Sequence, residues 1–244
     1  MTNSTIRSII EKFPKKRPPL PNKIKKIFDK LYLKNRHSFL SQLSERWLHY
    51  IIKDKNSNKR TLEIGAGTLN HLEYENLDKV YDIIEPKKFL FKNNLNKKFI
   101  NKIYKNLKKC KNLYYERIIS CAVLEHHTNL PEFLYLSSIK MSKKGYQSHS
   151  VPCEGYPAWD LTWFLINGII FKIKYGYSFK HIMRHEHVNN LDEITDLIKF
   201  FYKNVRIKYS YPFFNKYLSF YANIEFDEPN NKNIKKYLKI RSKK

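Results

Sequence analysis

Short apolar runs alternate with segments of helical periodicity along most of the chain. Apolar residues spaced by three and four predict helices over residues 22–53 and 191–204. Compact apolar runs bounded by polar or turn-forming residues predict buried strands over residues 61–65, 81–86, 117–123 and 146–152. Strands that alternate with helical material are typical of an α/β domain with a mainly parallel sheet.

The C-terminal part of the chain has a different pattern. Residues 205–213 and 218–226 predict two strands, with a short turn around residues 214–216 between them. We therefore expect the parallel sheet to end in a hairpin.

The chain divides by composition into two regions. Residues 1–58 are expected to form a basic N-terminal arm and a helical extension, and the proline-rich arm (1–20) is expected on the surface. Residues 59–244 are expected to form the main domain, since a chain of 244 residues suits one large domain with an extension.

The first predicted strand runs into a glycine-rich turn in "TLEIGAGTLNHLEY" (61–74). Gly65 and Gly67 allow a ligand to approach the backbone closely because neither has a Cβ. The turn lacks the Gly-Lys-Ser/Thr ending of an ATPase phosphate loop. Asn70 stands where a nicotinamide-binding turn has its third glycine. The pattern therefore disfavours both of these nucleotide classes.

S-adenosylmethionine has no phosphate, so a turn that offers close backbone approach suits it. Glu63 is placed to face the ammonium of this cofactor, directly or through water. Glu85 follows Gly65 by 20 residues at the end of the second predicted strand, where a carboxylate accepts hydrogen bonds from both ribose hydroxyls. The alternative is a helix-capping turn with Glu85 in solvent.

The segment "YERIISCAVLEHHTNLPEFL" (115–134) resembles the fourth motif of class I S-adenosylmethionine-dependent methyltransferases. "LEIGAGT", "DIIEP", "SCAVLEH" and "KKG" are similar to that family in order and spacing over residues 60–152. The resemblance implies a Rossmann-like α/β fold: a mainly parallel seven-stranded sheet with a reversed C-terminal hairpin strand and helices on both faces. It also implies S-adenosyl-L-methionine as cofactor. The residues that it places at the cofactor are Glu63, Gly65, Gly67, Thr68, Glu85, Asn106, Ser120, Cys121 and Ala122.

Two positions depart from the family's pattern. Leu69 stands where many relatives have a third glycine, so we expect a less tight turn there. In the family's third strand an Asp or Asn meets the adenine amino group, and Asn106 is the candidate in this chain.

A narrower resemblance is carried by "ERWLHY", "LEIGAGTLNHL", "AVLEH", "VPCEG" and "RHEHVNN". Together they resemble a bacterial subgroup associated with surface-polysaccharide (O-antigen or capsule) gene clusters. The resemblance implies methylation of a sugar or another polysaccharide component, and hence a small-molecule or glycan acceptor.

Histidines follow two of the segments expected at the carboxyl edge of the sheet. Transfer to a hydroxyl gains from a base of near-neutral pKa, so His126, His185 and His187 are the candidate catalytic residues. Packing against the adenine edge, or capping the next helix, is the alternative role for His126. Structural hydrogen bonding is the alternative role for His185 and His187. His181, His185 and His187 with Glu186 also suggest a metal site, because histidines at i and i+4 share a helical face. Magnesium, however, prefers carboxylates and water, so we predict no metal.

Residues 154–190 follow the last parallel strand, where members of the family insert an acceptor-binding lid. The apolar run "LTWFLINGIIF" in this segment suits a core helix, a lid over the acceptor, or a surface that touches a lipid-linked substrate. The candidate substrate-binding residues are Glu154, Trp159, Asp160 and Trp163.

The net charge of +25 has two interpretations. Nine of the 47 basic residues are Arg, and the abundant Lys, Asn, Ile, Tyr and Phe are what AT-rich codons specify. Compositional drift explains this pattern, and an anionic partner such as a phosphorylated acceptor also explains it.

A nucleic-acid substrate is disfavoured by the fourth predicted strand. Enzymes that methylate base amino groups have an Asn/Asp-Pro-Pro-aromatic segment there to hold a flipped base, and residues 120–123 are Ser-Cys-Ala-Val. Methylation of RNA ribose stays open. So does a protein that binds the cofactor without activity.

The sequence predicts a cytoplasmic protein. Three scattered cysteines do not form a disulfide framework, and the N-terminal 20 residues lack the apolar core of a signal peptide. No run approaches the roughly 18–20 apolar residues that cross a bilayer.

Overall fold

The computed structural model describes residues 3–27, 46–54, 58–76, 80–162, 165, 168–210 and 214–243. Within these residues the chain forms one seven-stranded sheet of order β3-β2-β1-β4-β5-β7-β6. The strands are β1 (Thr61–Ile64), β2 (Tyr81–Ile84), β3 (Lys102–Tyr104), β4 (Tyr115–Cys121), β5 (Met141–Pro152), β6 (Tyr202–Tyr209) and β7 (Tyr221–Pro229).

Strands β1 to β5 pair in parallel, and β7 is antiparallel to both β5 and β6. The predicted fold class is therefore confirmed, including the reversed C-terminal strand. The register pairs Ile64 with Ile84 and Cys121 with Ser150, so that the ends of the central strands meet at one edge. Ligands of open α/β sheets bind at that edge.

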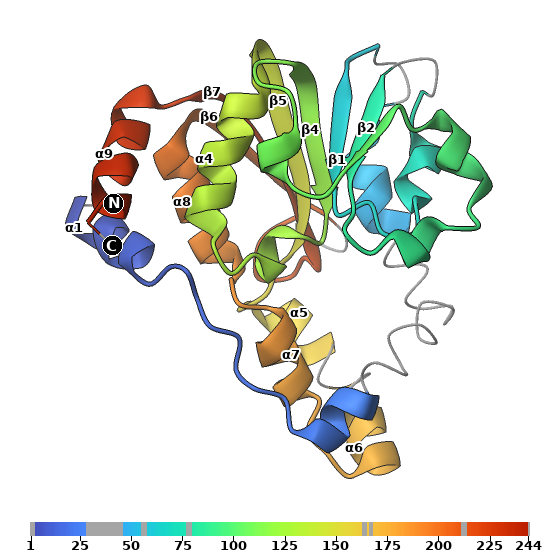
Figure 1. Ribbon diagram of the computed structural model, residues 1–244. Helices are drawn as coiled ribbons and strands as arrows, with labels where there is room; N and C mark the ends of the chain where they lie inside the picture. The colour runs from blue at the N-terminus through green and yellow to red at the C-terminus, as the bar shows by residue number, and fades with distance from the viewer. Residues whose placement is uncertain are drawn as a thin grey trace.

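Helices cover the sheet and extend below it (Figure 1). Residues 22–27 and 46–51 are helical as predicted, and residues 28–45 of that predicted helix lie outside the described part. The other α-helices are α1 (Asn3–Glu11), α4 (Leu130–Lys140), α5 (Pro157–Thr162), α6 (Ile169–Tyr175), α7 (Lys180–Glu186), α8 (Leu191–Phe201) and α9 (Asn231–Arg241).

The described residues between β1 and β3 form 3-10 turns where helical material is expected from the alternation. They are η1 (Asn70–Tyr74), η2 (Lys88–Phe91) and η3 (Leu95–Phe99), and η4 (Leu107–Lys109) and η5 (Leu124–His126) flank β4. These segments have three to five residues, too few to carry a helical period.

The two faces of the sheet bury different side chains because successive residues of a strand point to opposite sides. Leu62 and Ile118 join the larger core, which includes residues of α1, α4, α8 and α9. Tyr81 and Ile119 join a second core with Ile52, which follows the helix of residues 46–51. We call this second side the η1 face, because Leu72 of η1 packs into it.

Helix α8 begins where its sequence signals it. The side chain of the N-cap Asn190 accepts a hydrogen bond from Glu193 N, and the first turn holds two acidic residues. The helix ends at Phe201, three residues before the predicted end, because Tyr202 starts β6.

The N-terminal residues correct the expectation of a surface arm. Ile6, Ile10 and Phe13 are buried in the larger core. Beyond them, an extended segment leads to the helix of residues 22–27, which lies beside α6 and α7 (Figure 1). Ile24 of that helix packs with Phe171 and other apolar residues of this region.

Among the described residues, none of the helices has the length and apolar content that crossing a membrane requires.

Candidate active site

The glycine turn after β1 has the backbone geometry of a ligand-binding turn. Gly65 has φ +71° and Gly67 has φ +53°, in the left-handed region that favours glycine. A Cβ on Gly65 would lie 2.6 Å from Val123 Cγ2, so the turn packs tightly against the loop after β4. The two strand ends are thereby brought together.

Leu69 adopts φ +67° and is fully buried in the second core. It therefore takes the left-handed conformation that glycine would take at low cost. Leu69 N donates a hydrogen bond to the Ala66 carbonyl at 2.9 Å, and the packing of the Leu69 side chain anchors the turn.

The Glu85 carboxylate is held beside this turn. Its Oε2 accepts a hydrogen bond from Gly67 N at 2.9 Å, and its Oε1 accepts one from Lys87 N at 2.8 Å. Each carboxylate oxygen has a second lone pair. Glu85 lines a cavity, so a hydroxyl in that cavity can use these lone pairs.

The cavity has a volume of about 1080 Å³ and runs along the carboxyl ends of β1, β2 and β4. Most of the residues predicted at the site line it, and they come from five separate segments of the chain. They are Gly65, Gly67, Thr68, Glu85, Asn106, Cys121, Ala122, His126 and His187.

Two predicted cofactor residues do not line the cavity. Glu63 accepts a hydrogen bond from the Tyr81 hydroxyl at 3.0 Å on the η1 face, where burial raises its pKa to about 8. Ser120 lies on the opposite face with its Oγ 2.7 Å from His149 Nδ1. Alternation along the strands directs these two side chains to opposite faces of the sheet, where each is bonded to a neighbouring side chain.

The predicted substrate-binding residues are spread over the segment after β5. Trp159 packs edge-on against Tyr221, and Asp160 accepts a hydrogen bond from Gly155 N at 3.3 Å. Neither residue lines the cavity. Trp163 lies outside the described residues.

Glu154 instead forms a close pair with His187. His187 Nδ1 lies 2.6 Å from Glu154 Oε2, and both side chains are largely buried. The imidazole N–H donates this bond, since an ionised carboxylate only accepts. Burial acts to lower the pKa of His187, but the bond to Glu154 and the neighbouring carboxylates outweigh it and raise that pKa.

His126 lies edge-on to His187, with ring centroids 4.8 Å apart. Its Nδ1 donates to the Glu186 carbonyl at 2.8 Å, which leaves the lone pair of the neutral ring on Nε2. Burial, followed by the charge of His187, lowers the pKa of His126 to about 3. Burial raises the pKa of neighbouring Glu125 to about 7, and in the described part Glu125 Oε2 has no hydrogen-bond partner.

Arg17 joins the N-terminal segment to this site. It donates to the carbonyls of His185 and Glu186 at 2.6 and 2.9 Å, and to that of His126 at 2.7 Å. Arg17 also lines the cavity, whereas His185 does not and donates from Nδ1 to the Pro18 carbonyl at 2.7 Å. A single side chain thus ties α7 to the loop after β4.

Sequence reasoning missed Arg17 and the pairing of Glu154 with His187. Arg17 stands 109 residues from His126, and Glu154 stands 33 residues from His187. No local spacing reveals contacts of this range. The one available signal for Arg17 is its place among lysines and prolines in the predicted arm.

Solved structures share this architecture. A S-adenosylmethionine-dependent methyltransferase from Thermotoga maritima, described as a possible histamine N-methyltransferase, aligns with a TM-score of 0.57 at 13% identity, over 83% of this chain and 98% of its own. Another from Archaeoglobus fulgidus aligns with a TM-score of 0.54 at 16% identity, over 82% and 99%. The chain has the class I methyltransferase fold.

No protein-family model matches the chain, and no curated protein sequence matches it. At these identities the shared fold does not determine the reaction or the acceptor. Both are therefore argued from the residues of the cavity.

The residues of the cavity fit S-adenosylmethionine by their chemistry. Glu85 offers carboxylate lone pairs for ribose hydroxyls, and Asn106 offers an amide for the edge of a base. Ala122 adopts φ +50° at the end of β4, and such strained backbone clusters at ligand sites. The glycine turn exposes backbone groups to a ligand and lacks the sequence of a phosphate-binding loop.

Proposed function

We propose that the protein is a methyltransferase that moves the methyl group of S-adenosylmethionine to a hydroxyl of a sugar or another small acceptor. The observation that carries the proposal is that His187, which is paired with Glu154, lines the same cavity as the glycine turn and Glu85. The bound cofactor supplies an electrophilic methyl group on a sulfonium. The acceptor supplies the attacking hydroxyl, and residues of this chain supply the base and the groups that orient it.

His187 is the proposed base, and Glu154 positions it. Nδ1–H is committed to Glu154, so Nε2 carries the lone pair that accepts a proton. The carboxylate also stabilises the imidazolium that forms. As the O–CH₃ bond forms and the S–CH₃ bond breaks, the hydroxyl proton passes to Nε2 of His187.

His126 has a different proposed role. A ring with a pKa near 3 is neutral at pH 7 and is a weak base. Its Nε2 lone pair accepts a hydrogen bond from a second hydroxyl of the acceptor, other than the one that reacts, and so orients the acceptor. Arg17 holds the backbone of both histidine segments, which limits their movement.

The acceptor class is proposed from the basic side chains of the cavity and from the resemblance to the surface-polysaccharide subgroup. Arg17, Lys87 and Lys105 line the cavity together with the carboxylates of Glu85, Glu132 and Glu186. The carbonyls that Arg17 binds are neutral, and its ion-pair contact among the described residues is Glu186 Oε2 at 3.9 Å. A phosphorylated or nucleotide-linked sugar in the cytoplasm can place its anionic group against these basic side chains.

The test of the function is an acceptor screen with labelled S-adenosylmethionine. The protein is incubated with separate fractions of nucleotide sugars, phosphorylated metabolites, glycan and RNA, and label transfer is measured. We expect label in a sugar-containing fraction. Label in RNA ribose would replace the proposal with the nucleic-acid alternative, and cofactor binding without transfer to any fraction would support a binding protein.

Salt dependence separates a small acceptor from a polyanion. We expect the logarithm of the apparent acceptor affinity to fall with log salt by a slope of about one or two, because few charges are contacted. A long RNA that contacts six or more phosphates would give a slope of roughly six. Steady-state KM values between low and moderate salt provide the measurement.

A further inference from the structure

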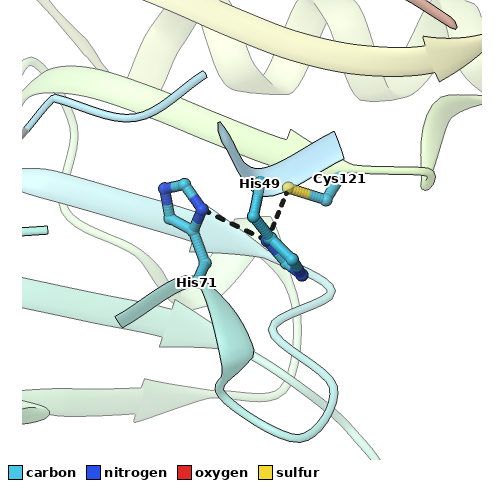
Figure 2. A group of neighbouring side chains, drawn as sticks. All are labelled: His49, His71 and Cys121. Atoms are coloured by element: carbon cyan, nitrogen blue, oxygen red, sulfur yellow. Dashed lines mark hydrogen bonds between the residues drawn. The ribbon is translucent and has the colours of Figure 1, made fainter. Parts of the chain in front are cut away.

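Three potential metal ligands meet on the η1 face (Figure 2), and the proposed proton transfer uses none of them. His49 comes from the helix of residues 46–51, His71 from η1, and Cys121 from the end of β4. His49 Nδ1 lies 3.2 Å from His71 Nδ1 and 3.1 Å from Cys121 Sγ. One ligand atom of each residue lies within 4.8 Å of the other two.

A buried carboxylate orients the His71 ring through its Nε2 atom. His71 Nε2 lies 2.8 Å from Glu75 Oε1, and Glu75 Oε2 accepts a hydrogen bond from Arg117 at 2.7 Å. The side chains of His71 and Glu75 are fully buried. Because Glu75 accepts the Nε2–H of His71, the lone pair of the neutral ring is on Nδ1 and faces His49 and Cys121. Metal-binding histidines are oriented in this way by a carboxylate.

The spacing of the three atoms suits a tetrahedral ion. Zinc bonds of about 2.0–2.1 Å to nitrogen and 2.3 Å to sulfur give tetrahedral edges of about 3.3 Å (N···N) and 3.6 Å (N···S). The N···N separation of 3.2 Å is close to its edge, whereas the N···S separation of 3.1 Å is about 0.5 Å short of its edge, so the ion requires an outward shift of Cys121 Sγ relative to His49. A hydrogen-bonded cluster is the alternative, with one His49 N–H facing both other atoms.

We propose that His49, His71 and Cys121 bind one zinc ion. Imidazole nitrogens with a thiolate select borderline-soft ions such as Zn²⁺ over magnesium or calcium. Three protein ligands leave a fourth position for water or for an anionic group. His49 and Cys121 also line the cofactor cavity, so this position is accessible from it.

The ion would tie together three elements that are distant in sequence. Residues 46–51 follow a stretch outside the described residues, and Ile51, with Ile52 directly after the helix, packs in the second core. A bond from His49 to β4 through the metal would fix this helix at the wall of the cavity. The ligands stand 22 and 50 residues apart along the chain, which is not the spacing of a zinc knuckle.

Cobalt spectroscopy of the full-length chain tests the site. The protein is freed of metal with a chelator, titrated with Co²⁺, and then back-titrated with Zn²⁺. We expect one equivalent of Co²⁺ to produce the intense visible bands of a four-coordinate ion and a thiolate-to-cobalt charge-transfer band. Zinc should displace cobalt, since it binds such sites more tightly.

Matched variants assign the ligands. Cys121→Ala should lose the charge-transfer band, whereas Cys153→Ala, which removes another buried thiol, should keep it. Glu75→Gln should weaken Co²⁺ binding by roughly 10–100-fold through loss of the orienting carboxylate. His49→Gln is the second ligand variant if Cys121→Ala does not fold.

Two results would overturn the proposal. The first is the absence of a thiolate charge-transfer band in the folded wild-type protein at stoichiometric Co²⁺. The second is a band that persists unchanged in Cys121→Ala or in His49→Gln. Either result would leave the three residues as a hydrogen-bonded cluster.

Discussion

Replacing His187 with asparagine is expected to lower turnover by about 10²–10⁴-fold, the usual contribution of a general base. The effect should fall on the chemical step, because His187 takes the proton of the acceptor and does not hold the cofactor in our proposal. Cofactor affinity, measured by calorimetry, should change little. His181→Ala is the matched control, since His181 is an exposed histidine at the start of α7.

The pH dependence of turnover distinguishes the two histidines of the cavity. A base acts when it is deprotonated, so turnover rises with pH through its pKa. The pKa of His187 is raised from its ordinary value of 6.5, which places the rise above pH 6.5. If His126, with a pKa near 3, were the base, turnover would be flat over the neutral range.

Glu154→Gln provides an independent check on the same base. Removing the carboxylate takes away the hydrogen bond and charge that raise the pKa of His187, so the pH step should move down. Turnover on the plateau should also fall, since the imidazolium is less stabilised. Full activity of His187→Asn, with an unaltered pH profile, would mean that the acceptor is already ionised and that positioning alone drives the transfer.

The parts of the fold that could be predicted are those with a strong local pattern. Strands β1 and β2 are buried at every position and β4 at five of its seven, because both faces of a parallel sheet are covered, and most of their residues are accordingly apolar. Strand β3 is a three-residue edge strand with exposed side chains, so it has no apolar run to identify it. Helix α1, in contrast, has a clear apolar pattern that the prediction did not use.

Ile6, Ile10 and Phe13 have the i, i+4, i+7 spacing of a helix that packs on one face. The proline and lysine content of the segment favoured a surface arm instead. The buried positions show that the periodicity was the better guide. Composition describes a whole segment, whereas burial depends on individual positions.

The candidate site divides in the same way. Residues within a few positions of a strand end, such as Glu85 and His126, were placed by the general geometry of parallel sheets, and both line the cavity. Residues that are distant in sequence and meet only in the folded chain could not be placed in this way. The contacts of Arg17 depend on where the N-terminal segment crosses the edge of the sheet. The pairing of Glu154 with His187 depends on the path of the chain after β5.

Replacing Glu85 with alanine is expected to weaken S-adenosylmethionine binding by about 2–4 kcal/mol, or roughly 30–1000-fold in Kd. Two contributions add to this loss. The cofactor ribose would lose two charge-assisted hydrogen bonds to the carboxylate. The glycine turn would also lose the acceptors of Gly67 N and Lys87 N, which the carboxylate now holds at 2.9 and 2.8 Å.

Calorimetry and thermal unfolding together separate these contributions. Loss of the backbone acceptors lowers the stability of the cofactor-free protein, whereas loss of the ribose contacts appears only in cofactor affinity. Glu73→Ala removes an exposed carboxylate from the neighbouring turn η1 and should change neither quantity appreciably. A folded Glu85→Ala protein that binds the cofactor as tightly as the wild type would contradict the assignment of this cavity to S-adenosylmethionine.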